Sequence, residues 1–241
     1  MKKKRSSSSQ SNGLSATPYG MVPPAGAEAA LYIYPGQWLF QWVDSGRQFF
    51  KYVSPATVRQ ALSKEPIDSG WIPANVIRWG TSRAGVFMVG FYPPALYDVP
   101  VEMEGQPVAL RIPLPALVFA GINSGYYMWA MKDAVLNPSG QLFQAPLPNI
   151  NKFGLICFGS NDHPHVSRGG FQRAWEMIWR SAWNDHHMQD RSKAAPADVR
   201  TQLKSLHEAQ AQEFPLDDLV PMHTTLDGAV KRLTRRGGED F

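Results

Sequence analysis

The sequence predicts an α+β fold in which an antiparallel β-meander is followed by helices packed on it. Short apolar runs separated by turn residues dominate from about residue 27 to residue 131, whereas apolar residues recur at helical spacing mainly after residue 169. Strands and helices that occupy separate parts of a chain are typical of this class. With 241 residues, 44% of them hydrophobic, the chain can bury a substantial core.

The first part of the chain predicts a tail followed by an N-terminal strand-rich extension. Residues 1–26 are rich in Ser, Gly, Pro and Lys, and we expect a disordered basic tail there. Aromatic and β-branched residues predict strands near 31–33, 38–43 and 49–53. The Ser-Pro pair that follows is typical of an N-cap and first helical position, which predicts a helix over 55–62.

The middle of the chain predicts the meander. Strand-like segments occupy 85–92, 107–112, 117–121 and 126–131. The last two are joined by Asn123-Ser124-Gly125, which is typical of a tight hairpin connection.

The last part of the chain predicts helices. A Pro-rich loop after Gly140 leads to a stripe of aromatic and aliphatic residues over 171–183, which indicates a helix packed on the sheet. A second helix is expected over 197–212, and the segment around Asp217-Asp218 should pack on the core. We therefore expect one domain over 27–225 and a loose charged tail over 226–241.

Charge and cysteine content limit the function classes. The formal net charge is +4, with much of the excess near the two ends, so the basic balance is weak support for a nucleic-acid surface and we expect no nucleic-acid partner. A single cysteine cannot form an intramolecular disulfide, which fits a reducing compartment. No apolar run reaches the length of a membrane span and no secretory signal is apparent, so we expect a cytoplasmic protein without a membrane partner.

One segment carries residues suited to chemistry. Residues 146–160 read PLPNINKFGLICFGS, and two prolines stiffen the approach to Asn149. Gly154 permits a turn before the lone Cys157, so the Asn149 amide could fold back on the thiol. A thiolate can attack a carbonyl carbon while a fixed amide donor stabilises the oxyanion, and these two groups are the minimum needed for acyl transfer.

The same residues also have a purely structural interpretation. A free cysteine between Ile156 and Phe158 is often a small buried hydrophobic residue. A Pro-Asn pair is often only a turn. Composition alone leaves both interpretations open.

This segment resembles the active-site motif of ubiquitin-conjugating enzymes. Their motif is His-Pro-Asn, an aliphatic residue, a short turn, Gly, one residue, Ile and the catalytic Cys. Here Pro148-Asn149-Ile150 is followed by Gly154, Ile156 and Cys157 in the same register, while Leu147 takes the place of the histidine. In the family that histidine mainly braces the loop, so the departure concerns the hydrogen bonding of the loop.

The resemblance extends over roughly residues 30–225 to a prokaryotic branch of these enzymes. Its members look like protein B of the PRTRC cassette and the conjugating component of bacterial ubiquitin-like defence operons, where a Pro-rich loop also leads to a sequence like Cys157-Phe158-Gly159-Ser160 and then to a Trp-rich helix. The resemblance implies a ubiquitin-conjugating-enzyme (UBC)-like fold. The N-terminal strands are an addition that the standard catalytic core does not need.

The resemblance further implies a mechanism and partners. Cys157 would accept a ubiquitin-like modifier as a thioester from a ThiF-like adenylating enzyme and pass it to an amine of a target protein. Asn149 would stabilise the oxyanion, and Asp162, His163 or His165 would polarise the amine, with Asp162 preferred. No cofactor is implied, a JAB-type protease is a possible operon partner, and phage defence and a plasmid cassette are both compatible roles.

Two rival functions remain open. A cysteine hydrolase would need a histidine such as His163 or His165 within hydrogen-bonding reach of Cys157. A non-catalytic binding module of the same fold would tolerate loss of Cys157. The sequence holds no Gly-rich phosphate loop and no HExxH pattern, and the neighbouring pair His186-His187 is a poor chelate on a helix, so we expect no metal site.

Overall fold

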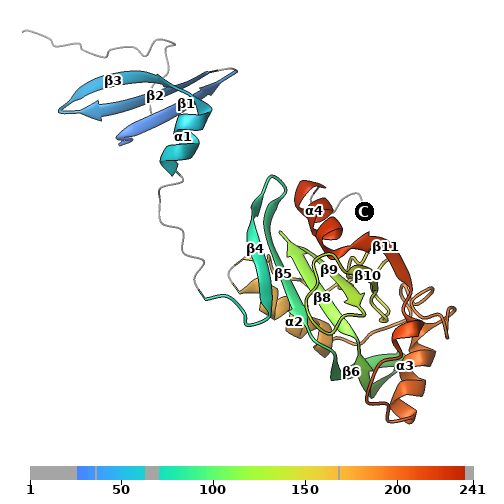
Figure 1. The fold of residues 1–241 in the computed structure, drawn as a ribbon. Coiled ribbons are helices and arrows are strands. Elements are labelled where there is room, and N and C mark those ends of the chain that lie inside the picture. Colours follow the sequence, from blue (N-terminus) through green and yellow to red (C-terminus); the bar gives the residue numbers. More distant parts are fainter. Residues whose placement is uncertain (1–25, 36, 63–70, 168, 237–241) are drawn as a thin grey trace, which may run out of the picture. The chain divides into compact units, whose positions relative to one another are not determined.

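The computed structural model describes residues 26–35, 37–62, 71–167 and 169–236 (Figure 1). Contacts divide the chain into two compact units, Met1–Gly70 and Trp71–Phe241. The sequence instead suggested one domain over 27–225, and we describe the two units separately. The tail expected over 1–26 lies outside the described residues except for Gly26.

The first unit is a small antiparallel sheet followed by one helix. Its strands lie in the order β1-β2-β3. The strands and the helix α1 have the bounds β1 Ala29–Tyr34, β2 Gln37–Asp44, β3 Arg47–Val53 and α1 Pro55–Leu62. These elements confirm the three strands and the helix that the sequence predicted. Leu39 and Gln41 on one face of β2 are buried. On the other face, Phe40 stacks on Trp42, which also stacks on Phe49 of the neighbouring β3.

The second unit is organised around a six-stranded antiparallel sheet. The strand order is β11-β10-β9-β8-β5-β4. The strand bounds are β4 Val76–Ser82, β5 Gly85–Tyr92, β8 Ala116–Ile122, β9 Gly125–Met131, β10 Gln141–Gln144 and β11 Pro221–Thr225. The strands β5, β8 and β9 confirm the predicted meander, and the Ile122–Gly125 pair confirms the tight hairpin between β8 and β9. All residues of β8 are buried, as expected for a central strand covered on both faces.

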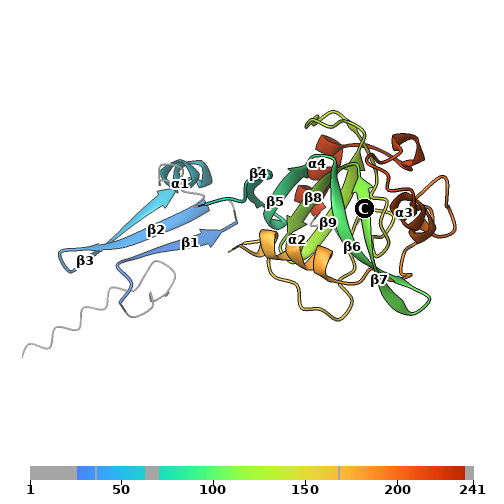
Figure 2. The same cartoon turned by 90° about the horizontal axis from the view of Figure 1, so that it is seen from below.

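A long hairpin interrupts the meander between β5 and β8. Its strands are β6 Ala95–Met103 and β7 Gln106–Leu114, and they pair along their whole length (Figure 2). The sequence predicted a strand over 107–112, which lies within β7, but did not predict β6. The inward-facing residues of the hairpin, including Val99, Val101 and Ile112, join the main core.

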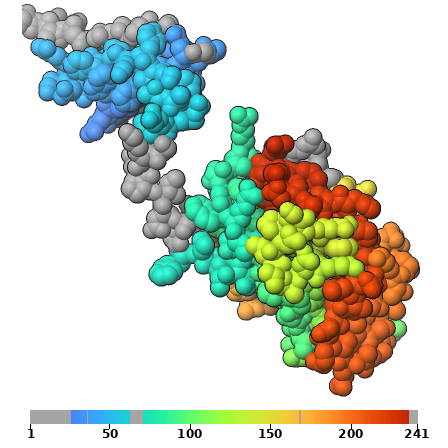
Figure 3. Space-filling view, in the orientation of Figure 1, coloured from blue at the N-terminus to red at the C-terminus, as the bar shows by residue number. Residues whose placement is uncertain are grey.

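Helices cover both faces of the sheet (Figure 2). The three helices are α2 Gly170–Arg180, α3 Val199–Glu208 and α4 Leu226–Arg236. On one face, α2 and α3 share a core with the hairpin, Phe119 and Met128. On the opposite face, α4 packs on a second core that contains Val118 and Trp129, and it lies next to β4 and β5 in the space-filling view (Figure 3).

The helix α2 is fixed by aromatic stacking. Trp175 stacks on Tyr92 and Trp179 stacks on Tyr97, with ring centroids 3.6 Å and 4.4 Å apart. Burial raises the pKa of Tyr97 to about 12 and that of Tyr92 further. We predicted that this helix extends to residue 183, but it ends at Arg180. Trp183 continues in extended chain because its N–H donates to Pro100 of β6 at 2.8 Å.

Two further expectations concern the end of the chain. The segment around Asp217-Asp218 packs on the core as predicted, since Leu219 is fully buried and Asp218 Oδ1 accepts a hydrogen bond from Ser192 Oγ at 2.8 Å. The loose tail predicted over 226–241 is wrong for residues 226–236, which form α4, and 237–241 lie outside the described residues. Leu226, Ala229, Val230 and Leu233 form a buried stripe at helical spacing, which holds α4 on the sheet. None of the helices in the described parts of the chain is both long and apolar enough to cross a bilayer.

Candidate functional site

The candidate site lies where the strand β10 leaves the sheet. β10 pairs with β9 as far as the Gln144–Trp129 pair. The chain then departs over residues 145–153, which we call the excursion, and returns at Gly154, whose carbonyl oxygen accepts a hydrogen bond from the Met128 N–H at 2.8 Å. The returning segment resumes antiparallel pairing with the same strand. The excursion is therefore displaced from the sheet while both of its ends are fixed by β9.

The return to the sheet requires a glycine. Gly154 has φ +95°, a conformation that other residues adopt only with strain. A Cβ atom at this position would fall on the indole nitrogen of Trp129. That nitrogen donates to the Phe153 carbonyl oxygen at 2.9 Å, so the last residue of the excursion is tied to the core. The permissive turn that the sequence suggested at Gly154 is thus confirmed, and a close approach adds to the need for glycine.

The end of the excursion folds back as a tight hairpin that brings Asn149 and Cys157 together. The Cys157 N–H donates to the Asn149 carbonyl oxygen at 2.8 Å. Ile150 and Ile156 form an antiparallel bridge inside this hairpin. Asn149 itself has φ +56°, in the left-handed region that Asn tolerates better than most residues. The eight-residue spacing seen in the sequence therefore corresponds to one closed hairpin.

A second segment fixes Asn149 from outside the hairpin. The Asn149 N–H donates to the His186 carbonyl oxygen at 2.6 Å, and Asn149 Oδ1 accepts from the Asn184 N–H at 3.1 Å. Leu147, which stands where the related motif has histidine, is fully buried in the main core. The loop is thus braced by backbone groups of residues 184–186 and by apolar packing.

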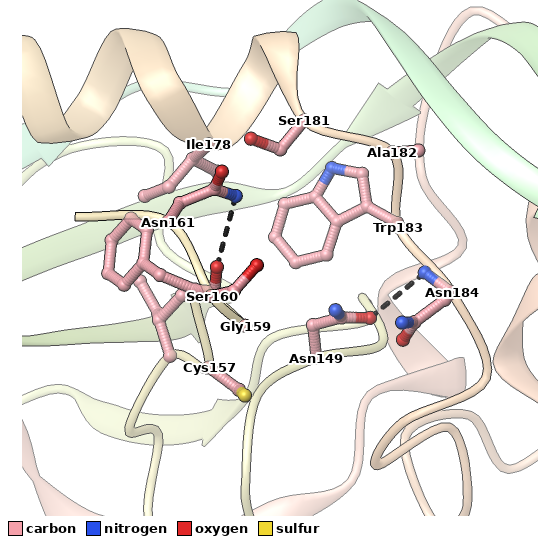
Figure 4. A pocket seen from close by; sticks show the side chains of 12 residues that line it. Asn149, Cys157, Gly159, Ser160, Asn161, Ile178, Ser181, Ala182, Trp183 and Asn184 are labelled. Carbon is pink, nitrogen blue, oxygen red and sulfur yellow. Dashed lines mark hydrogen bonds between the residues drawn. The ribbon is translucent and has the colours of Figure 1, made fainter. Parts of the chain in front are cut away.

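A pocket of about 190 Å³ opens beside this hairpin. Asn149 and Cys157 lie at the same end of it, as Figure 4 shows. Cys157 is partly exposed and lines the pocket, so the residue is not sealed inside the core. The other lining residues come from the segment after Cys157 and from the end of α2 with the chain that follows: Ile156, Phe158, Gly159, Ser160, Asn161, Ile178, Ser181, Ala182, Trp183 and Asn184.

The pocket lining is neutral. The described residues that line it include no Asp, Glu, Lys, Arg or His, and the thiol of Cys157 is the one titratable side chain among them. Amide and hydroxyl groups supply its polarity, and Trp183 and Ile178 supply its apolar wall. Such a lining can donate hydrogen bonds to a carbonyl oxygen, but it contains no group to accept a proton from an attacking amine.

The structure separates the other predicted site residues from the pocket. Asp162 is exposed and does not line it. The ring of His163 stacks on Phe158, with ring centroids 4.9 Å apart, and His165 Nδ1 lies 2.8 Å from Ser167 Oγ. None of the six histidines, all of which are described, lines the pocket, so the geometry lends no support to a cysteine hydrolase with a histidine base.

His186 and His187 lie outside the pocket as well. Their ring centroids lie 3.9 Å apart. The pKa of His187 is lowered mainly by burial and, to a smaller extent, by the positive charges of His186 and Arg191. Among the residues that the structure describes, no group of three or more His, Cys, Asp or Glu side chains is placed to hold a metal ion.

The sequence did not predict the contribution of Asn184. This residue lies 35 positions after Asn149 and follows a helix with no motif of its own. An Asn side chain often accepts a hydrogen bond from the backbone N–H two residues later and so forms a local turn. That local tendency does not reveal that Asn184 also contacts the distant Asn149. Contact with Asn149 arises from the tertiary structure.

Comparison with known proteins gives a match to a protein family. The model of a family described as prokaryotic E2 family D matches residues 51–222. No curated protein and no solved structure matches the chain.

Proposed function

Because the chain belongs to prokaryotic E2 family D, we propose that it is a conjugating enzyme for a ubiquitin-like protein, with a UBC-like catalytic domain and Cys157 as the residue that carries the modifier. The family match confirms the resemblance to a prokaryotic branch of E2-like proteins. It also indicates, in general terms, that the chain works with a ubiquitin-like modifier and an activating enzyme.

One observation carries the proposed chemistry. Cys157 is partly exposed at the same end of a pocket as the Asn149 side chain, and a backbone hydrogen bond of 2.8 Å joins the two residues. A cysteine kept only for packing would need neither the opening nor the amide beside it. The arrangement supports acyl transfer at this sulfur.

The proposed reaction has two transfers. In the first, the Cys157 thiolate attacks the C-terminal carbonyl carbon of the modifier on the activating enzyme and a new C–S bond forms. The C–S bond to the activating enzyme breaks, and its cysteine leaves as a thiolate. In the second, a target amine attacks that carbon, a C–N bond forms, the C–S bond to Cys157 breaks, and the amine loses a proton. Both steps pass through an oxyanion, to which the Asn149 amide would donate.

The amine must lose its proton to a group outside the neutral pocket. We assign this role to Asp162, which is exposed five residues after Cys157. No hydrogen bond or ion pair occupies its carboxylate within the described part of the chain, so its charge is available to an incoming ammonium group. Replacing Asp162 with Asn should slow transfer to amines without slowing the loading of Cys157.

The proposed partners follow from this reaction. They are the ubiquitin-like modifier, an adenylating ThiF-like enzyme that supplies it, and a target protein. A JAB-type protease encoded nearby would remove the modifier again. We propose a cytoplasmic setting, with antiphage defence as the biological role to be tested.

The decisive experiment is a thioester assay. The chain is incubated with ATP and with the activating enzyme and ubiquitin-like protein encoded next to it. We expect an adduct that thiols remove, and we expect Cys157→Ser to give an ester that thiols leave intact. Without an adduct from partners that are active with each other, the conjugating function is wrong and a binding module remains.

A matched substitution tests the Asn149 amide. Asn149→Gly removes the donor while its backbone accepts a φ of +56° without strain. We expect transfer from Cys157 to slow by ~10²–10³-fold, as for loss of an oxyanion donor elsewhere. Thermal unfolding controls for the fold, and an unchanged transfer rate would remove Asn149 from the mechanism.

A further inference from the structure

The amide of Asn149 is held in one orientation by its hydrogen bonds. A backbone N–H can only donate, so the atom facing the Asn184 N–H at 3.1 Å must be the amide oxygen of Asn149. The amide nitrogen therefore occupies the other position. Within the described parts of the chain, no acceptor takes a hydrogen bond from this nitrogen. It remains available to donate in the pocket that it shares with Cys157.

This orientation matters because the two ends of the amide have opposite effects on an oxyanion. The nitrogen donates a hydrogen bond and stabilises the negative charge, whereas the oxygen would face that charge with a lone pair. A free asparagine side chain samples both orientations. A fixed donor to the oxygen removes the unfavourable one before the substrate arrives.

The donor belongs to a segment that is itself rigid. Trp183, the preceding residue, donates to the Pro100 carbonyl oxygen at 2.8 Å and accepts from the Glu102 N–H at 2.7 Å, so it is clamped to β6. Its side chain is only 3% exposed. The backbone N–H of Asn184 is thus held in place, because the residue before it cannot move without disrupting the core.

The side chain of Asn184 completes the segment. Its Oδ1 accepts a hydrogen bond from the His186 N–H at 3.0 Å and closes a local turn. That turn presents the His186 carbonyl oxygen to the Asn149 N–H at 2.6 Å. Asn149 is therefore held at its backbone and at its side chain by one turn, and Asn184 shapes that turn.

We propose that Asn184 is a positioning residue for the transfer reaction, which orients the Asn149 amide so that its nitrogen faces the acyl group on Cys157. This inference rests on the proposed function. Asn184 acts through Asn149 and need not contact the substrate. Position 147, where the related motif has a bracing histidine, is occupied here by Leu147, which is buried in the core and has no side-chain hydrogen-bonding group. Asn184 provides the bracing instead.

The test uses an acyl group that needs no protein partner. Cys157 is acetylated with S-phenyl thioacetate, and the decay of the acetyl-enzyme in hydroxylamine is followed by mass spectrometry. The variants are Asn184→Ala, which opens the turn, Asn184→Ser, whose hydroxyl can accept the same hydrogen bond, Asn149→Gly, and the double variant Asn184→Ala with Asn149→Gly.

We expect Asn184→Ala to slow the decay by ~10-fold, less than removal of the Asn149 amide, because misplacing a donor forfeits part of its effect. Asn184→Ser should recover most of the rate. In the Asn149→Gly background, Asn184→Ala should cause no further loss, since the group it positions is gone. Alkylation of Cys157 by iodoacetamide forms no oxyanion and should be equally fast in all forms.

Two results would overturn the inference. One is a wild-type decay rate in Asn184→Ala, and the other is the same fold-loss from Asn184→Ala with and without the Asn149 amide, which would indicate only a structural effect. Unfolding temperatures show whether each variant is folded. If Asn184→Ala does not fold, the comparison is made with Asn184→Ser. Failure of the proposed function appears elsewhere, as the lack of a modifier adduct on the wild-type chain.

Discussion

Asn149 combines two properties that few residues share. Its backbone lies in the left-handed region, with φ +56°, where Asn is one of the best tolerated non-glycine residues. Its side chain provides an amide donor beside Cys157. Glycine would suit the backbone and lack the donor, while glutamine would carry the amide on a longer, less suitable side chain.

The Gly154 return is a position where a single added methyl group should be costly. Gly154→Ala adds left-handed strain and a clash with Trp129. We expect unfolding to become easier by about 3 kcal/mol, combining strain and overpacking of about 1–2 kcal/mol each. Chemical denaturation measures this loss.

Gly159→Ala is the matched control for that substitution. Gly159 also has a positive φ, +63°, but a Cβ atom there meets nothing within 4 Å. It should therefore lose only the strain of about 1–2 kcal/mol. Equal losses at the two glycines would show that the approach to Trp129 is not tight.

At the scale of residues, the sequence predicted the part of the candidate site whose residues are close together in the chain. Asn149 and Cys157 are eight residues apart, and a local hairpin brings them to one pocket as expected. Asp162 was placed near the sulfur by sequence distance, but its exposed side chain does not line the pocket. Asn184 could not be predicted, because its approach depends on how α2 lies against β6.

Among the elements, those with a continuous apolar signal were predicted. The strands β8 and β9 are buried along nearly their whole length, and their sequences are apolar throughout. The strands β4, β6, β10 and β11 were missed. β10 has four residues, β11 begins with Pro221, and β6 contains Pro100, so each lacks the alternating run by which a strand is recognised.

The helix α4 was missed because its charged composition predicted a loose tail, although the segment packs on the sheet as a helix. Five of its eleven residues are charged, and Gly228 lowers its intrinsic helix propensity. Four apolar residues nevertheless recur on one face and are buried. Packing on the sheet stabilises this helix more than its own sequence does.

The N-terminus of α3 makes stability depend on pH. Asp198 caps the helix by accepting from the Arg200 N–H at 2.9 Å, and it forms an ion pair with the Arg200 guanidinium at 2.8 Å. Burial opposes ionisation of this carboxyl, but the hydrogen bonds from Arg200 prevail and lower its pKa from 3.8. A lowered pKa adds stability above pH 3.8 that is lost as the pH falls through the folded value.

Asp198→Asn tests this dependence because it keeps the cap and removes the charge. At pH 7 the wild-type protein should be more stable than this variant, and the difference should shrink as the pH falls below 3.8 and through the lowered folded pKa. Asp198→Ala, which also removes the cap, should cost a further ~1 kcal/mol. Urea unfolding at several pH values measures both, and a difference that persists undiminished in acid would contradict the assignment.

At the scale of the whole molecule, two units differ greatly in their cores. Leu39 is the one buried hydrophobic residue described in the unit Met1–Gly70, whereas the unit Trp71–Phe241 has two extensive cores. Small units bury too little surface to be more than marginally stable. The sequence could not show this division, because both units contain aromatic strands of similar appearance.

Hydrogen exchange of the intact chain tests the difference between the units. We expect the amides of β1, β2 and β3 to lose protection at lower denaturant concentration than those of β8 and β9. Simultaneous loss of protection in both sets would mean that the chain unfolds as one cooperative domain, as the sequence first suggested.

The excursion at residues 145–153 leaves β9 and returns to it, so the sheet fixes both of its ends but not its length. Adding or deleting one residue there would alter how Asn149 meets Cys157 while every strand kept its partner. The proposed transfer reaction could therefore be lost in a single genetic event while the fold is kept. Under the proposed function, such an event would turn a transferase into a folded protein that still binds its partners but no longer reacts with them.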